Sequence, residues 1–130
     1  MYKWIASLLA VMLVFSFSVQ VASAKTFVRG CADITAAYDT EVFYAKEGTI
    51  VFEEKMRLAN RKYIDVRIEL RTADGEVVQT RVGNVYNFYS SAESPFTVPE
   101  DGAYYFHLVN ETPDSHWWLI YKVHDHYKPI

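Results

Sequence analysis

Hydrophobic and polar residues alternate most strictly between residues 63 and 71. Every second residue of this segment is aliphatic, and the residues between them are charged. The aliphatic set is Ile64, Val66, Ile68 and Leu70, and the charged set is Asp65, Arg67, Glu69 and Arg71. A repeat of two residues turns one set toward a protein core and the other toward solvent. The segment therefore predicts a strand of an antiparallel sheet that has one face in water.

A second strand is predicted over residues 76–82, antiparallel to the first. The register of this hairpin depends on the length of its turn. A two-residue turn would place Leu70 opposite Gln79, whereas a three-residue turn ending at Gly75 places Leu70 opposite Val78. Because a slip of one residue exchanges the two faces of a strand, the apolar pairing favours the three-residue turn. Such a turn needs a residue at positive φ, which Gly75 supplies.

Short apolar or alternating segments, separated by turn residues, occupy most of the remaining chain. Residues 34–44 are predicted to form one long strand or two short ones, 34–38 and 41–44, and further strands are predicted over residues 49–58, 84–90, 103–110 and 116–123, while Phe96 and Val98 lead into a turn at residues 99–102. Residues 49–58 also contain good helix formers, but the segment is shorter than the ~12 residues that an isolated helix needs. Residues 25–32 are expected to form a loose lead-in, residues 90–94 a loop and residues 124–130 a mobile tail. Seven or eight strands spaced about ten residues apart predict an all-β fold, a single antiparallel β-sandwich.

The last two predicted strands are expected to form a hairpin in which Leu108 lies opposite Trp117. Alternation then places an apolar and aromatic set on the core face: Tyr104, Phe106, Leu108, Trp117, Leu119 and Tyr121. The opposite face of the hairpin carries Tyr105, His107, Trp118 and Ile120. A flat aromatic set beside a histidine is suited to stacking on sugar rings or to contact with a protein, so these four residues are the predicted binding site. The alternative is that residues 25–44 cover this face.

The same part of the chain contains a turn followed by a glycine, alternating aromatic and apolar residues and an asparagine. This pattern is the sequence PEDGAYYFHLVN of residues 99–110. It resembles the end of small jelly-roll-like sandwiches, such as GOLD domains and bacterial pre-peptidase C-terminal domains. Those families are accessory or cargo-recognition modules, so the resemblance implies a jelly-roll-like sandwich with a binding role and carries no catalytic residue.

The first residues differ in composition from the rest of the chain. Lys3 is the only charge before residue 25, residues 4–21 are mainly apolar, and residues 22–24 form a small-residue cleavage pattern. These features predict a signal-peptide helix, residues 1–24, that is removed to leave a secreted domain of residues 25–130. An uncleaved membrane anchor is the alternative, which the serines and the glutamine within the apolar stretch disfavour. A membrane is therefore expected as a partner only through the signal peptide, before cleavage.

The charge balance argues against nucleic acid as a partner. The chain has 13 Lys and Arg against 16 Asp and Glu, which gives a formal net charge of −3. No cluster of basic residues stands out in the sequence, and phosphate binding requires one.

Cys31 is the only cysteine, so an internal disulfide is excluded. A secreted domain without disulfides must be held together by its core, and an aromatic content of 16% can supply one. The thiol is either idle or forms an intermolecular disulfide that links a dimer.

The sequence contains none of the common catalytic motifs, such as Gly-x-Ser-x-Gly, His-Glu-x-x-His or a glycine-rich phosphate loop. The adjacent Glu53 and Glu54 would face opposite sides of a strand and cannot form a facing carboxylate pair. The histidines are candidate metal ligands, with Asp114 or Asp125 as a third ligand: His107, His116, His124 and His126. Since two of them lie in the expected tail without a fixed partner, we predict no metal site, no cofactor and no catalytic residue.

Together these observations predict a secreted, non-enzymatic binding module. It is expected to act at the cell surface or outside the cell on a protein or carbohydrate partner. The alternatives are a small secreted hydrolase or metal-dependent enzyme, and a secreted toxin or inhibitor whose fold presents a blocking surface.

Overall fold

The computed structural model describes residues 25–58, 64–85 and 89–126. Within these residues the regular structure is entirely β-strand. The strands are β1 (Thr26–Ile34), β2 (Ala37–Asp39), β3 (Phe43–Ala45), β4 (Gly48–Leu58), β5 (Ile64–Thr72), β6 (Val77–Val85), β7 (Tyr89–Val98), β8 (Gly102–Asn110) and β9 (Trp117–His124). The predicted signal peptide, residues 1–24, lies outside the described residues and stays a prediction.

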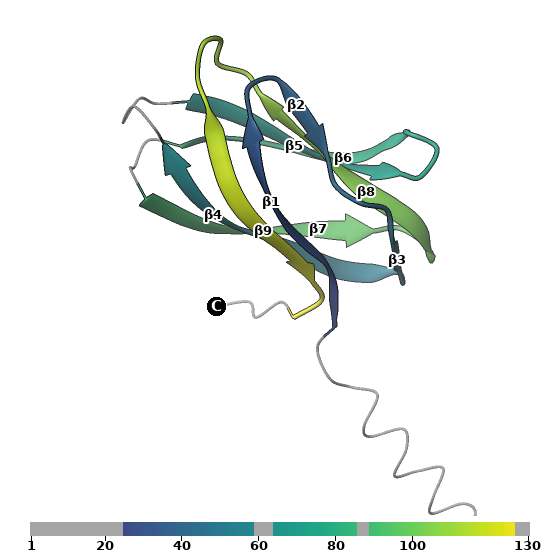
Figure 1. Ribbon diagram of the computed structural model, residues 1–130. Coiled ribbons are helices and arrows are strands. Elements are labelled where there is room, and N and C mark those ends of the chain that lie inside the picture. The colour runs from purple at the N-terminus through teal and green to yellow at the C-terminus, as the bar shows by residue number, and fades with distance from the viewer. Residues whose placement is uncertain (1–24, 59–63, 86–88, 127–130) are drawn as a thin grey trace, which may run out of the picture.

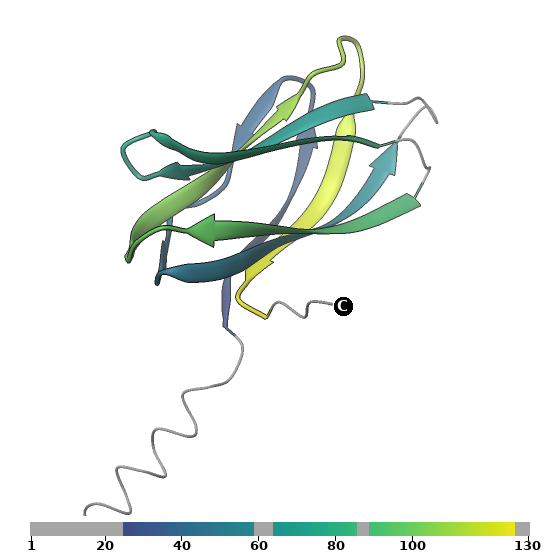
Figure 2. The same cartoon turned by 180° about the vertical axis from the view of Figure 1, so that it is seen from behind.

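The strands form two antiparallel sheets that pack face to face (Figure 1). The first sheet has the order β1-β9-β4-β7, and the second has the order β2-β8-β5-β6 with β3 also paired to β8. Figure 2 shows the same two layers from behind. The predicted all-β, antiparallel, jelly-roll-like sandwich is confirmed, with nine strands in the described residues in place of seven or eight.

The core lies between the inner faces of the two sheets and is built largely from aromatic side chains. Phe106 of β8 is its centre, with ring centroids 5.0 Å from both Phe52 of β4 and Phe96 of β7 and 5.9 Å from Phe43 of β3. All four rings are buried. Aromatic pairs at these separations add to the free energy of burial, so they can hold the sheets together although the chain has no internal disulfide.

The turn between β5 and β6 has the predicted length. The backbone N–H of Thr72 donates to the carbonyl of Glu76 at 2.9 Å, and the N–H of Gly75 donates to the carbonyl of Thr72 at 2.8 Å. Gly75 has a φ of 93°, in the left-handed region that favours glycine. The three-residue turn is therefore confirmed.

The register beyond this turn differs from the prediction because β6 contains a bulge. Arg71 lies opposite Val77, as a three-residue turn requires, but Leu70 lies opposite Gln79, so Val78 is an extra residue on β6. The predicted pair of Leu70 and Val78 was therefore wrong. The shift brings Gln79 to the edge of the sandwich, where its side-chain oxygen accepts a hydrogen bond from the backbone N–H of Thr97 in β7 at 2.9 Å.

The predicted hairpin of the last two strands is also wrong, since β8 and β9 belong to different sheets. The connection between them crosses from the second sheet to the first, and the buried Asn110 fixes its start. The Asn110 side-chain amide donates to the carbonyls of Ile34 and Ser115 at 3.0 and 3.2 Å. Its side-chain oxygen accepts from the backbone N–H of Thr112 at 3.0 Å. The sequence predicted which residues of each strand face the core, but not which strand each one pairs with.

Several strand boundaries also differ from the predictions, because they depend on pairing with strands that are distant in the sequence. The expected lead-in, residues 25–32, contains most of β1, because this segment pairs with β9 along its length. The expected loop, residues 90–94, is part of β7, which pairs with β4. Residues 49–58 form a strand as predicted. His124, which was assigned to the tail, is the last residue of β9 and is buried.

The two ends of the described chain are joined to each other. The backbone N–H of Lys25 donates to Asp125 Oδ1 at 2.6 Å, and the N–H of Asp125 donates to the Lys25 carbonyl at 3.1 Å. Both ends therefore leave the sandwich at the same pole, which is the lower one in Figure 1.

Candidate functional site

Strand β9 presents two large apolar side chains to solvent. Trp117 and Leu119 point into the sandwich and are fully buried, whereas Trp118 and Ile120 point outward with exposed fractions of 41% and 50%. Strand β1 pairs with the edge of β9 and leaves Trp118 uncovered. The alternative that residues 25–44 cover this side chain is therefore not observed.

The other half of the predicted site lies elsewhere. Tyr105 and His107 are on β8, half-buried on the outer face of the second sheet. The sandwich thus separates the four predicted residues into two pairs on opposite outer faces. Their grouping into one patch was wrong, because it depended on the hairpin of β8 and β9 that does not form. A binding role for either pair stays a prediction.

The surface around Trp118 and Ile120 is made by three neighbouring strands. Cα pairing places Asp33 of β1 beside Trp118, and Cys31 of β1 and Lys55 of β4 on either side of Ile120. Because paired residues of neighbouring strands point to the same side, these side chains share the outer face of the first sheet. We call this surface the Trp118 face.

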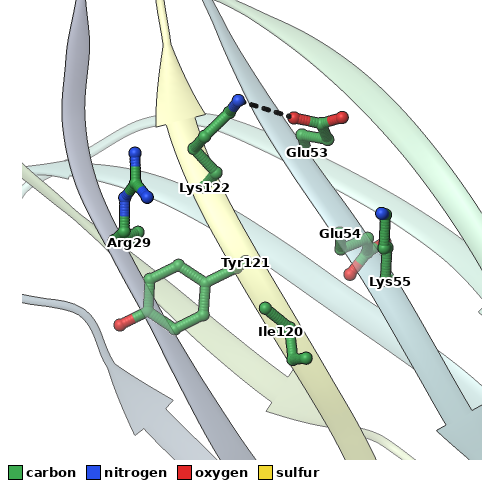
Figure 3. Close-up of a pocket in the computed structure, with 7 residues that line it drawn as sticks. All are labelled: Arg29, Glu53, Glu54, Lys55, Ile120, Tyr121 and Lys122. Carbon is green, nitrogen blue, oxygen red and sulfur yellow. Dashed lines mark ion pairs between the residues drawn. The ribbon is translucent and has the colours of Figure 1, made fainter.

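A hollow of about 230 Å³ lies on the Trp118 face next to Ile120 (Figure 3). Its lining residues come from β1, β9 and β4: Arg29, Glu53, Glu54, Lys55, Ile120, Tyr121 and Lys122. Alternation turns five of these side chains outward, while Glu54 and Tyr121 point inward and are buried. The hollow is therefore a depression whose floor is the sheet itself and whose rim carries charged side chains.

The rim of the hollow has more positive than negative charge. It carries Arg29, Lys55 and Lys122 against one outward carboxylate, that of Glu53. Glu53 Oε2 lies 3.6 Å from Lys122 Nζ and 3.5 Å from His124 Nε2. Among the described residues, Arg29 and Lys55 have no ion-pair partner within 4.0 Å, so their charges are available to a ligand.

A buried carboxyl lies directly behind this surface. Glu54 projects from β4 into the sandwich, between Ala92 of β7 and Tyr121 of β9 in the register, and only 4% of it is exposed. Among the described residues its Oε2 atom has no hydrogen-bond partner. Burial raises the pKa of this carboxyl from its ordinary value of 4.5 to about 8, because the charged form loses its hydration. Glu54 is therefore a neutral acid over most of the physiological pH range.

Tyr121 makes the second polar contact inside the sandwich. Its hydroxyl lies 3.1 Å from that of Tyr38 on β2, so it links the two sheets. Burial, and then the hydrogen bond with Tyr38, raises the pKa of the Tyr121 phenol. The Tyr121 ring lies over Gly30 of β1, where an added Cβ would be 2.6 Å from the tyrosine oxygen. The glycine is required there because no side chain fits beneath the ring.

The outer face of the second sheet is occupied by internal ion pairs. Glu69 is buried there between Arg67 and Arg71, with 3.0 Å between Arg67 Nε and Glu69 Oε2. Nδ1 of His107 lies 2.5 Å from Asp39 Oδ1. These charged groups of the described residues are paired with one another, so this face offers fewer unpaired charges to a ligand than the Trp118 face does.

Three of the described histidines, His107, His116 and His124, each contact one carboxylate, and they do not converge. His116 Nδ1 lies 3.0 Å from Asp33 Oδ1, and the contacts of His107 and His124 are those given above. No group of three or more His, Cys, Asp and Glu side chains with the arrangement of a metal site occurs in the described part of the chain. Cys31 is exposed, and its proposed disulfide stays a prediction. None of the described segments is a helix long and apolar enough to span a membrane.

Sequence reasoning missed the charged rim and the buried acid. Arg29 was assigned to the lead-in, so nothing placed it near β9, and Lys55 could not be positioned without knowing that β4 and β9 pair. The adjacent positions of the two glutamates in β4 did contain information about the buried acid. They correctly predicted that Glu53 and Glu54 face opposite sides, and since one side of a sandwich strand is the core, one of the two had to be buried.

Comparison with known proteins defines the fold but no family. No family model matches the chain, and no curated protein matches it by sequence. A family 35 carbohydrate-binding module from Clostridium thermocellum superposes with a TM-score of 0.53 at 9% identity, over 82% of this chain and all of that one. The CBM22-1 xylan-binding domain of Xyn10C from Paenibacillus barcinonensis gives 0.50 at 10% identity, over 78% and 81% of the two chains. The CBM1 module of BiXyn10A gives 0.51 at 9% identity, over 82% and 93%.

These similarities confirm a jelly-roll-like sandwich. These three structures are carbohydrate-binding modules rather than domains of the GOLD or pre-peptidase type that residues 99–110 resemble. At 9–10% identity the likeness concerns the fold alone.

Proposed function

We propose that the chain is a non-enzymatic module that binds carbohydrate through the Trp118 face. The observation that carries the proposal is the solvent-exposed indole of Trp118 beside Ile120, with the charged hollow next to them. A large apolar side chain is expensive to leave in water, so two of them on adjacent outward positions of one strand mark a contact surface.

The chemistry of this surface suits a sugar. An indole offers an apolar face to the C–H groups of a pyranose ring and an N–H that can donate a hydrogen bond. Neighbouring Lys and Arg side chains can donate to ring hydroxyls. In the hollow, such donors lie close to Trp118 and Ile120. An apolar surface with a few polar groups beside it is the usual composition of a ligand site.

The fold also supports a carbohydrate-binding role. Proteins with the same sandwich architecture include modules described as carbohydrate-binding and as xylan-binding. Among the described residues, neither carboxyl of the hollow is free to act as a catalyst: Glu54 points into the core, and Glu53 lies against Lys122 and His124. A role in attachment to a polysaccharide, without cleavage of it, follows.

Affinity electrophoresis in gels that contain soluble polysaccharides tests the proposal. We expect at least one polysaccharide to retard the protein, and Trp118→Ala to lower that affinity about tenfold or more, as loss of a central aromatic contact does. Val82→Ala is the control, because Val82 is 79% exposed on β6 of the other sheet. The proposal fails if no polysaccharide retards the protein, or if both variants bind as the wild type does.

We also propose that the module is secreted after cleavage behind Ala24. The support is the composition of residues 1–24 and the position of Lys25, whose backbone nitrogen lies 2.6 Å from Asp125 Oδ1. Cleavage there would leave an α-ammonium beside this carboxylate, so an ion pair would replace a hydrogen bond from an uncharged amide. N-terminal sequencing of protein from the extracellular fraction should begin at Lys25. Recovery of the full-length chain from membranes would contradict the proposal.

A further inference from the structure

We infer that the ligand of the Trp118 face is anionic: a polysaccharide whose sugar rings carry carboxylate or sulfate groups, with one such group seated in the hollow. The inference rests on the proposed function, which it narrows to one chemical class. It concerns residues that the sequence pattern did not point to, namely Arg29 and Lys55.

The charge of the hollow is opposite in sign to that of the protein. The chain has a formal net charge of −3, whereas the outward side chains of the hollow are three bases and one acid. The one outward acid, Glu53, lies against Lys122 and His124, so it does not neutralise Arg29 or Lys55. Glu54, the other acid of the hollow, points to the interior and is neutral up to a pH of about 8. A locally positive site favours an anionic ligand, even on a protein whose net charge is negative.

The two bases without ion-pair partners in the described residues stand on either side of β9. Arg29 is on β1 and Lys55 is on β4, which are the two neighbours of β9 in the first sheet. Neighbouring strands are about 4.8 Å apart, and Arg29 pairs with Lys122 whereas Lys55 pairs with Ile120, so these side chains start roughly 12 Å from each other across the sheet. They can therefore both reach one anionic group above Ile120 without having to contact each other.

The apolar pair and the bases can act on one ligand at the same time. Cα pairing places Lys55 opposite Ile120, and Trp118 lies two residues further along the same face of β9. A chain of sugar rings that lies along β9 would place one ring against Trp118 and the anionic group of a neighbouring ring over the hollow. A guanidinium matches a carboxylate or a sulfate with two parallel hydrogen bonds, and a lysine adds a point charge.

The test compares ligands that differ only in charge. The purified protein is titrated with polygalacturonate and with its fully methyl-esterified form, and in a second arm with dextran sulfate and with dextran. The variants are Lys55→Met, the double change Arg29→Gln/Lys55→Met, and Lys46→Met as the control. Lys46 is an exposed lysine between β3 and β4, outside the hollow, so its change removes the same charge from another part of the surface.

We expect tighter binding to at least one charged polymer than to its neutral counterpart, and weaker binding as salt rises. The double variant should lose about tenfold in affinity for the charged polymer, Lys55→Met about threefold, and Lys46→Met almost nothing. Binding of polygalacturonate alone would identify a carboxylated sugar, and binding of dextran sulfate alone a sulfated one.

The inference is overturned if the neutral polymers bind as well as the charged ones, or if Lys46→Met costs as much as Lys55→Met. If neutral polymers bind and Trp118→Ala removes that binding while the double variant has no effect, the proposed function stands and this inference fails. Absence of binding to any of the four polymers and to the wider polysaccharide panel overturns both.

Discussion

The buried Glu54 should make the stability of the fold depend on pH, and Glu54→Gln should remove that dependence. In the folded protein the Glu54 carboxyl keeps its proton up to a pH of about 8, whereas its ordinary pKa is 4.5. Between these values the unfolded chain has released the proton and the folded chain has not. The contribution of Glu54 to stability is therefore complete below a pH of about 4.5 and is lost as the pH rises toward 8.

The size of the effect follows from the two pKa values. Each pH unit between them lowers the free energy of unfolding by about 1.4 kcal/mol, so the total loss from this one group approaches about 5 kcal/mol at pH 8. A domain of this size has a free energy of unfolding of about 5–15 kcal/mol. The wild type should thus be distinctly less stable at pH 8 than at pH 5.

Urea denaturation of the wild type and of Glu54→Gln at pH 5, 6, 7, 8 and 9 measures this difference. Glutamine keeps the shape of the side chain and carries no proton that titrates. We expect the two proteins to have nearly equal free energies of unfolding at pH 5, and the variant to become more stable than the wild type by about 1.4 kcal/mol for each further unit up to pH 8. Glu93→Gln, which removes a carboxylate from an exposed position on β7, is the control and should not show this divergence. Parallel stability curves for the wild type and Glu54→Gln would show that the reasoning about burial is wrong.

Three further changes test the packing and the turns. Gly30→Ala should lower the free energy of unfolding in urea by about 1–3 kcal/mol, because its Cβ would lie 2.6 Å from the Tyr121 hydroxyl. The control is Gly83→Ala, whose Cβ would meet nothing within 4 Å, and this change should cost much less. Equal costs would argue against the close contact. Gly75→Val should cost about 1 kcal/mol or more because of the φ of 93°, with an unchanged free energy of unfolding as the contrary result. Asn110→Ala should cost about 2–4 kcal/mol, since it leaves buried carbonyls at both ends of the crossing without a donor; a loss below about 0.5 kcal/mol would mean that water replaces the amide.

The sequence was a reliable guide to which side of a strand each residue faces. The inward set of β8, Tyr104, Phe106 and Leu108, and that of β9, Trp117, Leu119 and Tyr121, are all buried as alternation predicted. Alternation is a property of one strand and its environment, so it can be read from the segment alone. The confirmed positive φ of Gly75 is a local property of the same kind.

Pairing between strands could not be predicted in the same way. Alternation is equally compatible with β8 and β9 as a hairpin and with β8 and β9 in separate sheets, because both arrangements bury the same side chains. The deciding contacts are long-range, such as the hydrogen bond from Asn110 to the Ile34 carbonyl, 76 residues away in the sequence. The bulge at Val78 is likewise accompanied by a contact between the sheets, from Thr97 to Gln79, that the sequence of the hairpin alone does not reveal.

The candidate site depended on pairing, so it was only half predicted. Trp118 and Ile120 are consecutive outward residues of one strand and were correctly placed together on one exposed face. Their charged neighbours come from β1 and β4, which are about 90 and 65 residues away along the chain, so they could be found only once the sheet order was known.

The hydrogen bonds that join Lys25 and Asp125 also determine at which side the domain can be attached to another molecule or to a support. Strand β9 runs from Trp117, at the pole far from the chain ends, to His124, at the pole where Asp125 meets Lys25. The six residue steps from Trp118 to His124 span roughly 20 Å at the usual rise of a strand. A tether, a fusion partner or a solid support attached at Lys25 or at Asp125 would therefore leave Trp118 far from the point of attachment. The domain could also be inserted into a loop of another protein, since its two ends enter and leave side by side.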